Sequence, residues 1–246
     1  MCGRYTLFTP VAELEPRFGA TFGEGYRPGY NRAPGEQLPV ITAEDPERAT
    51  RMEWGLTPSW AEESFGLINA RAETVREKRS FADAYESRRC LVPADGFYEW
   101  VEESGEKRPY RVAFDDDRPF AMAGLYERWR PPEPETTQTG LGAFGEGTAD
   151  EGGAVDDGGA VDGPDDDVVE TFTVVTTDPN ELIDDLHYRM AVILDPDEEA
   201  TWLHGDPSEA AALMDPYPAD EMRAFPVSDR VNAAGTDGPE LIEPVG

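Results

Sequence analysis

Cysteine and long apolar runs are scarce in this chain, and each shortage excludes a class of protein. The two cysteines, Cys2 and Cys90, are too few for a disulfide framework, and no Cys-x-x-Cys or His-x-x-x-His spacing predicts a metal site. We therefore expect no metal and no cofactor. No apolar run approaches the ~20 residues of a membrane span. The N-terminus also lacks the basic and apolar regions of a signal peptide, so we expect a cytoplasmic protein without membrane contact.

Lysine is almost absent, and the chain is strongly acidic. It has 52 acidic and 21 basic residues, only two of them lysine, and a formal net charge of −31 at pH 7. Such a surface resembles that of halophilic proteins, where dense carboxylates hold water although molar salt shortens the Debye length to ~3 Å. A disordered acidic protein is excluded because the acidic residues alternate with patterned hydrophobic segments. Any phosphate contact must come from a local arginine cluster within this surface.

One segment, at about residues 131–167, breaks the hydrophobic pattern. It begins Pro-Pro-Glu-Pro-Glu and continues with glycine, aspartate and alanine, without any periodicity. Strand-like sequence lies on both sides, and the residues that follow are too few for an independent core. We therefore expect a single domain over residues 1–246, with a disordered acidic insert between two of its strands.

Short strand patterns dominate the rest of the chain. Seven of them lie at residues 38–41, 50–54, 89–92, 97–100, 110–113, 121–125 and 171–175. Helical patterns lie at Val11–Phe18, at Ser80–Arg89 with Ser80 as N-cap, at Pro179–Leu186 after Asp178, and at Asp197–Leu203. The expected fold is α+β, a mixed and largely antiparallel β-sheet or barrel with peripheral helices.

Cys2 directly follows the initiator methionine. Removal of Met1 would leave an α-amine and a thiol on one residue, with ordinary pKa values of about 8 and about 8.5, so that both groups are partly reactive near neutral pH. Two such nucleophiles can attack one carbonyl carbon in succession. Position alone does not distinguish this chemistry from a chance cysteine.

Five polar and aromatic segments follow the Met1-Cys2-Gly3-Arg4 start in order. They are Tyr30–Pro34, Trp54–Trp60, Asn69–Thr74, Pro93–Trp100 and His187–Met190. With the final Asp237–Pro244, they resemble the SRAP family, first called SOS response-associated peptidases, which crosslink to abasic sites in single-stranded DNA. The resemblance extends along the whole chain and is interrupted chiefly by the acidic insert.

The resemblance implies single-stranded DNA with an abasic site as the partner. The α-amine of Cys2 would condense with the open-chain aldehyde of the sugar, and its thiol would close a thiazolidine ring. Met1 must first be removed, either by an aminopeptidase or by the protein itself, and reversal of the adduct would be a lyase-type activity. A monomer suffices for one lesion.

Three other residues match catalytic positions of the family. Glu99 lies between two aromatic residues, where a raised pKa would suit a general acid or base, although a strand glutamate is by default solvated. His187 would transfer protons, although a lone histidine is usually structural. Asn69 would orient the amine or the sugar oxygen, although an asparagine is by default a loop cap.

The resemblance also implies DNA contacts. Arg4, Arg71 and Arg189 match phosphate-binding positions, and Trp60 matches an aromatic wedge beside the lesion. Base stacking on an aromatic contributes roughly 1–3 kcal/mol and survives salt better than phosphate pairing. Thr176 is expected to line the same groove. The chain departs from the family in two respects, with Ala191 in place of a common proline and without the expected lysines.

Three alternatives remain open. An N-terminal-nucleophile hydrolase such as a glutamine amidotransferase also begins Cys-Gly, but uses the thiol for acyl transfer and the amine as its base. We find no glutamine-binding set for it in the sequence. A non-covalent binder of damaged DNA would leave Cys2 inert and retain Met1. A peptidase acting on other proteins would need a peptide subsite, which no motif indicates.

Overall fold

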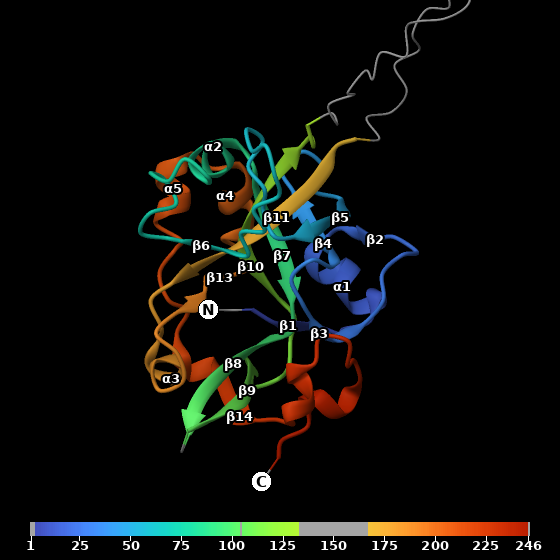
Figure 1. The fold of residues 1–246 in the computed structure, drawn as a ribbon, viewed down its shortest axis with the longest axis vertical. Helices are drawn as coiled ribbons and strands as arrows, with labels where there is room; N and C mark the ends of the chain where they lie inside the picture. The colour runs from blue at the N-terminus through green and yellow to red at the C-terminus, as the bar shows by residue number, and fades with distance from the viewer. Residues whose placement is uncertain (1–2, 104, 133–166, 246) are drawn as a thin grey trace, which may run out of the picture.

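Two β-sheets organise residues 3–103, 105–132 and 167–245, the residues that the computed structural model describes (Figure 1). The nine-stranded sheet contains β2 (Thr21–Phe22), β4 (Gln37–Thr42), β5 (Arg48–Trp54), β6 (Asn69–Arg71), β7 (Arg89–Ala94), β10 (Phe120–Trp129), β11 (Val169–Thr177), β12 (Met190–Ala191) and β13 (Ile193–Leu194). The five-stranded sheet has the order β14 (Met222–Pro226), β9 (Glu106–Phe114), β8 (Gly96–Glu103), β1 (Tyr5–Leu7) and β3 (Gly29–Arg32).

Part of the larger sheet closes on itself. Strand β11 pairs antiparallel with β10 and parallel with β5, and β10, β7, β4 and β5 complete the ring through antiparallel pairs. Trp54 and Phe172 stack where the ring closes, with their centroids 6.3 Å apart. The predicted α+β fold, with a mixed, largely antiparallel sheet or barrel, is confirmed.

All seven predicted strands are present, because each carries residues that the barrel or the second sheet buries. Strand β7 is buried at every position, as expected of a strand covered on both faces. Cys90 lies within it and is fully buried. The strands of two to four residues, such as β1 and β6, are too short to show a period.

The helices are peripheral, and α1 (Val11–Phe18) has the predicted bounds. The prediction for Ser80–Arg89 was too long, because α2 covers only Ala82–Ser87. Its N-cap is Phe81, not Ser80, and no side chain caps this end. Burial of the Phe81 side chain fixes the start of the helix, and Arg89 already belongs to β7.

The remaining helices are also shorter than predicted. Helix α3 covers Glu181–Asp184, and its N-cap is Asn180, not Asp178, because the Asn180 side chain accepts a hydrogen bond from the amide of Ile183. Helix α4 covers Glu199–His204, and the unpredicted α5 (Pro207–Ala211) follows it with an Asp206 capping box. The 3₁₀ turns are η1 (Ala219–Glu221), η2 (Asp229–Asn232) and η3 (Pro239–Ile242).

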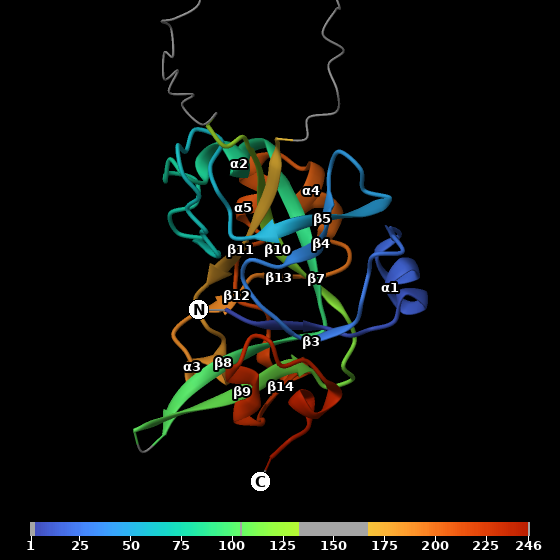
Figure 2. The same ribbon diagram turned by 45° about the vertical axis from the view of Figure 1, so that its right-hand side comes forward.

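The predicted insert at 131–167 lies outside the described residues, apart from positions 131, 132 and 167. The strands on either side, β10 and β11, pair antiparallel up to Trp129 and Val169. Figures 1 and 2 show this end of the pair far from β8. Among the described residues, no helix is long and apolar enough to cross a membrane.

Candidate active site

Glu99 is a buried carboxyl group at the centre of β8. In β8 the side chain of Phe97 joins the main core, whereas that of Tyr98 packs into a small separate cluster. Glu99 therefore lies on the same side of the strand as Phe97, as predicted, and only 2% of it is exposed. Burial raises the pKa of Glu99 to about 7. A carboxyl group with this pKa exchanges its proton readily at neutral pH.

Glu99 and His187 line the same hollow, of about 450 Å³, although 88 positions separate them in the sequence. Trp100, Lys107 and Asn232 complete the lining. Lys107 comes from β9, and the indole nitrogen of Trp100 donates to Oδ1 of Asn232 at 2.7 Å. The hollow thus brings together two of the four predicted catalytic residues.

His187 lies in the turn between α3 and β12 and is half-buried. The amide of Arg189 donates to its Nδ1 at 3.1 Å. The carbonyl oxygen of Arg189 lies equally close to Nδ1, at 3.1 Å, so the backbone of this one residue holds that side of the ring. Burial lowers the pKa of His187 below its ordinary value, which favours the neutral ring. The ring is therefore oriented through Nδ1 and is neutral over a wider range of pH than a solvated histidine.

Arg189 holds this turn in place. Its guanidinium is buried and donates to the carboxylate of Glu73, to Asp178 at 3.1 Å and to the carbonyl oxygen of Thr176. The hydrogen bond from Arg189 also holds the pKa of Glu73 below its usual range. With these partners, Arg189 positions His187 in this structure, and a phosphate contact would have to displace them.

Strand β6 carries Asn69 and Arg71 along β11. Asn69 lies opposite Val174, and Arg71 lies opposite Thr176. The Thr176 side chain is fully buried and donates to the carbonyl oxygen of Ala70 at 3.3 Å, so it supports this strand from beneath. Arg71 is exposed, whereas Asn69 is half-buried and does not line the hollow of Glu99.

Arg4 lies at the start of β1, beside β8. Its guanidinium donates to Oδ1 of Asn31 at 2.7 Å and to the carbonyl oxygen of Val231 at 2.8 Å. Its backbone carbonyl accepts from the amide of Tyr98 at 3.0 Å. The register pairs Tyr5 with Phe97, so each step towards the N-terminus advances one residue along β8 towards Glu99. Cys2 itself lies outside the described residues.

Trp60 belongs to an exposed cluster away from the hollow. The guanidinium of Arg79 lies 4.1 Å from the centre of its ring, and Phe65 packs against it edge to face at 5.4 Å. Trp60 is 38% exposed and Phe65 is 41% exposed. This aromatic surface is therefore open to a base.

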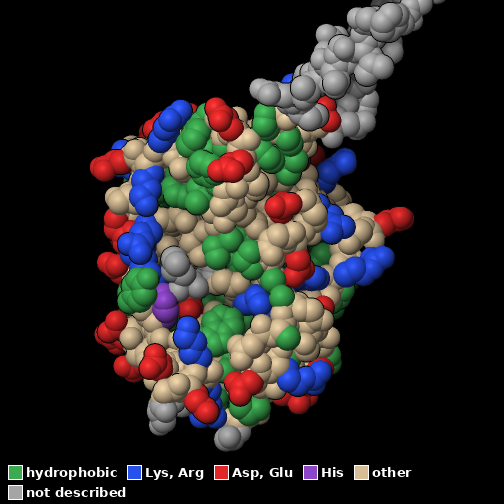
Figure 3. All heavy atoms as spheres, in the orientation of Figure 1, with side chains coloured by type: hydrophobic (Ala, Val, Ile, Leu, Met, Phe, Trp, Pro, Cys, Tyr) green, Lys and Arg blue, Asp and Glu red, His purple; other side chains and the backbone are tan. Residues whose placement is uncertain are grey.

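Basic side chains gather next to Trp60 in the otherwise acidic surface. The end of β6 and the segment from there to α2 expose a basic patch that consists of Arg71, Arg76, Lys78 and Arg79. Figure 3 shows basic side chains in a row along the left edge of the molecule, where this segment runs in Figure 1. Acidic side chains are scattered over the rest of that face. The patch is a local basic cluster of the kind that phosphate contact requires in such an acidic chain.

Sequence reasoning missed four residues of the site: Trp100, Lys107, Asn232 and Tyr188. Tyr188 is 58% exposed, and its ring stacks on that of His187 with the centroids 4.4 Å apart. Its place between His187 and Arg189 could have drawn attention to it. Lys107 was detectable as one of only two lysines, whereas Asn232 reaches the site through tertiary packing.

Comparison with known proteins identifies the family. The family described as SOS response associated peptidase (SRAP) matches residues 1–234. The chain is a member of the SRAP family. Among its SRAP relatives, the abasic site processing protein YoqW of Bacillus subtilis (strain 168) is 37% identical over 254 residues, which cover 99% of each chain. The abasic site processing protein HMCES of Pongo abelii is 31% identical over 264 residues, covering 89% of this chain and 66% of its own length.

Solved structures share the fold of this chain. A protein from Bacteroides thetaiotaomicron matches with a TM-score of 0.78 and 25% identity, over 99% of this chain and 100% of its own. A protein from Bordetella bronchiseptica shares the fold with a TM-score of 0.71 and 23% identity, over 92% of this chain and 100% of its own.

Proposed function

We propose that this SRAP protein processes abasic sites in single-stranded DNA by forming a covalent thiazolidine with Cys2, once Met1 has been removed. The matched relatives are named abasic site processing proteins, which supports the class of lesion. One chain acts on one lesion as a monomer. The scarcity of lysine and the net charge of −31 support a cytoplasm rich in salt as its setting.

The pairing of β1 with β8 carries this proposal. Arg4 is bonded to Tyr98, and the continuing register directs the preceding residues towards Glu99. A carboxyl group with a pKa of about 7 therefore lies on the path of the N-terminal segment. His187 faces the same hollow. This arrangement supports a reaction that needs an N-terminal amine beside a proton carrier.

The reaction balances with the loss of one water. His187 donates a proton to the sugar oxygen as the ring opens. The Cys2 amine adds to the aldehyde carbon, and Glu99 carries the two amine protons in turn from the nitrogen to the oxygen, which leaves as water to give an imine. The thiol then adds to the imine carbon, and its proton passes to the nitrogen. Asn69 orients the amine or the sugar oxygen.

The DNA path combines charge with stacking. The basic patch binds phosphates, and Arg4 adds a contact when the strand displaces its present partners, whereas Arg189 keeps its ion pair with Glu73 and holds the turn of His187. Trp60 stacks on a base at one side of the lesion. Tyr188, exposed above His187, provides a second stacking surface, which keeps its strength in concentrated salt. Thr176 supports the groove from below.

Intact-mass spectrometry tests the proposal directly. The purified protein is measured in high salt before and after mixing with a single-stranded oligonucleotide that carries one abasic site. We expect the mass without Met1, followed by a gain equal to the oligonucleotide minus one water. Cys2→Ala should give no adduct, whereas Cys90→Ala, the matched change at the buried cysteine, should leave it intact.

Other outcomes would identify the alternatives. An adduct that survives Cys2→Ala would overturn the thiazolidine mechanism. A processed chain without adduct would favour amidotransferase chemistry, which glutamine hydrolysis would reveal. Retained Met1 with reversible binding would leave a non-covalent binder. Self-processing is tested with the Glu99→Gln variant, expressed in a host whose aminopeptidase removes Met1 from a control Met-Cys protein. Retention of Met1 in the variant alone would show that the protein removes its own Met1.

A further inference from the structure

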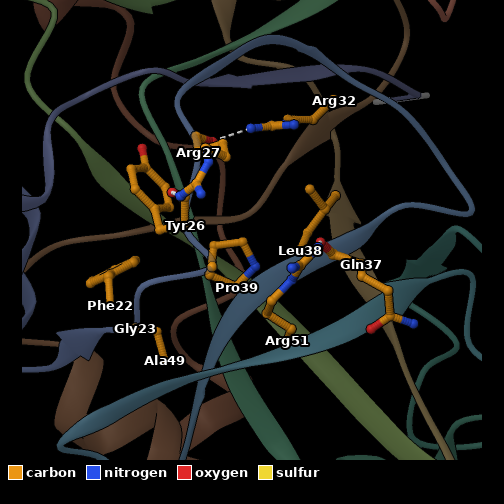
Figure 4. A pocket seen from close by; sticks show the side chains of 11 residues that line it. Phe22, Gly23, Tyr26, Arg27, Arg32, Gln37, Leu38, Pro39, Ala49 and Arg51 are labelled. Atoms are coloured by element: carbon orange, nitrogen blue, oxygen red, sulfur yellow. Dashed lines mark hydrogen bonds between the residues drawn. The ribbon is translucent and has the colours of Figure 1, made fainter.

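A second pocket lies beside β4 and β5 of the larger sheet, where the segment between β2 and β3 folds over these two strands. It has a volume of about 270 Å³ (Figure 4). Its lining consists of Phe22, Gly23, Gly25, Tyr26, Arg27, Arg32, Gln37, Leu38, Pro39, Ala49 and Arg51. No residue of the first hollow is among them.

The charge of this lining is opposite to that of the chain. It contains three arginines and no carboxylate, although the chain has 52 acidic and only 21 basic residues. Arg32 forms an ion pair with Glu36 at 3.2 Å. Arg27 and Arg51 are exposed and, within the described parts of the chain, donate to backbone carbonyls and form no ion pair. Two guanidinium groups are thus available to an anion.

The pocket also has a fixed apolar wall. Figure 4 shows Pro39 in the middle of the lining, with Tyr26 and Arg27 to one side and Arg51 to the other. The Tyr26 hydroxyl donates to the carbonyl oxygen of Thr9 at 2.7 Å, which holds the ring in place. A Cβ on Gly25 would lie 3.4 Å from a guanidinium nitrogen of Arg51, which places the two residues side by side in the lining. A flat apolar group can lie on this wall while an attached anion reaches the arginines.

We propose that this pocket binds a nucleotide, with the base against Tyr26 and Pro39 and the phosphate between Arg27 and Arg51. Its volume, near the lower limit of ~300 Å³ for small-molecule sites, fits one nucleotide and excludes two stacked ones. Arginine presents paired donors that match phosphate oxygens. The nucleotide comes either from the lesion-bearing strand or from free solution.

The sheet connects this pocket to the active site. Arg32 on β3 lies opposite Tyr5 on β1, which lies opposite Phe97 on β8, two residues before Glu99. Two strand spacings amount to about 10 Å, or roughly three nucleotides of a stacked strand. A strand held at the lesion therefore reaches the pocket on one side only. The assignment of the nucleotide to the lesion-bearing strand rests on the proposed function.

Single-stranded oligonucleotides with a central tetrahydrofuran, an abasic analogue without an aldehyde, test this inference without any crosslink. They carry one or six thymidine nucleotides on the 5′ side, the 3′ side or both. We expect the double variant Arg27→Ala/Arg51→Ala to bind about tenfold more weakly to oligonucleotides with six nucleotides on one of the two sides, either 5′ or 3′. For oligonucleotides with a single nucleotide on that side, the loss should be less than about twofold. Arg48→Ala, an exposed change on β5 outside the pocket, is the matched control.

Calorimetry with dTMP and thymidine distinguishes the free nucleotide. One result would assign the pocket to a free mononucleotide. In that case wild type binds dTMP but not thymidine, the double variant does not bind dTMP, and the double substitution has the same effect on oligonucleotides of every length. Equal affinities of wild type and double variant for every oligonucleotide and for dTMP would overturn the inference. Because tetrahydrofuran cannot react, failure of the crosslink in the Cys2 experiment leaves this result unaffected.

Discussion

The amide nitrogen and the carbonyl oxygen of Arg189 both lie 3.1 Å from Nδ1 of His187, so the backbone of Arg189 orients the imidazole ring. Arg189 in turn is held by Glu73, which lies just beyond β6. The orientation of one imidazole thus depends on an ion pair between residues 116 positions apart in the sequence. The orientation of His187 and the packing of the segment after β6 are therefore coupled.

Glu99→Gln should slow crosslinking in a pH-dependent way. The carboxylate accepts a proton from the Cys2 amine, and this form becomes dominant above the pKa of about 7. We expect wild type to exceed the variant about 100-fold at pH 8 and to approach it at pH 5. Single-turnover rates at several pH values measure the ratio. A constant ratio across this range would contradict the role of a base.

The same substitution should stabilise the folded protein at alkaline pH. The pKa of Glu99 is about 7 when folded against 4.5 for an ordinary glutamate, so the folded state binds this proton more tightly. Stability is therefore lost as pH rises from 4.5 to 7, by as much as about 3 kcal/mol. Denaturant unfolding should show Glu99→Gln to be more stable at pH 8 and unchanged at pH 4. Equal stability of wild type and variant at both pH 4 and pH 8 would mean that water reaches the Glu99 carboxyl group in the folded protein.

Tyr188→Ala should weaken reversible binding of single-stranded DNA about fivefold to 150-fold, because base stacking contributes roughly 1–3 kcal/mol. Tyr188→Phe keeps the ring and should bind as wild type. Fluorescence anisotropy with a tetrahydrofuran oligonucleotide measures both, at low and at molar salt. The loss should persist in molar salt. A loss that disappears there would indicate an effect of charge and not of stacking.

Glu73→Gln should slow crosslinking about threefold to tenfold while DNA affinity stays within twofold, since it loosens Arg189 and with it the His187 ring. Glu77→Gln, an exposed change in the same segment, is the control for charge. Rates and affinities are measured on the same preparations. A parallel fall in affinity would show that Arg189 and Glu73 act on DNA binding instead.

The long strands were predictable because their sequences are apolar runs that the sheets bury almost continuously, and α1 because its apolar residues recur at helical spacing. The ends of α2 and α3 were not, since burial of Phe81 and the contact of Asn180 with the amide of Ile183 decide them. Glu99 and His187 were found through family motifs, and their shared hollow is a product of topology. Asn232 reaches it from a C-terminal turn that carries no local signal.

Strands β10 and β11 remain paired as far as Trp129 and Val169, so the chain leaves and re-enters the sheet at neighbouring positions. Closing a loop between two such fixed ends costs only about 0.6 kcal/mol more for each doubling of its length. This junction therefore tolerates large changes in the number of residues between its strands. It offers a place to graft a fluorophore or a purification tag far from the chemistry on β8.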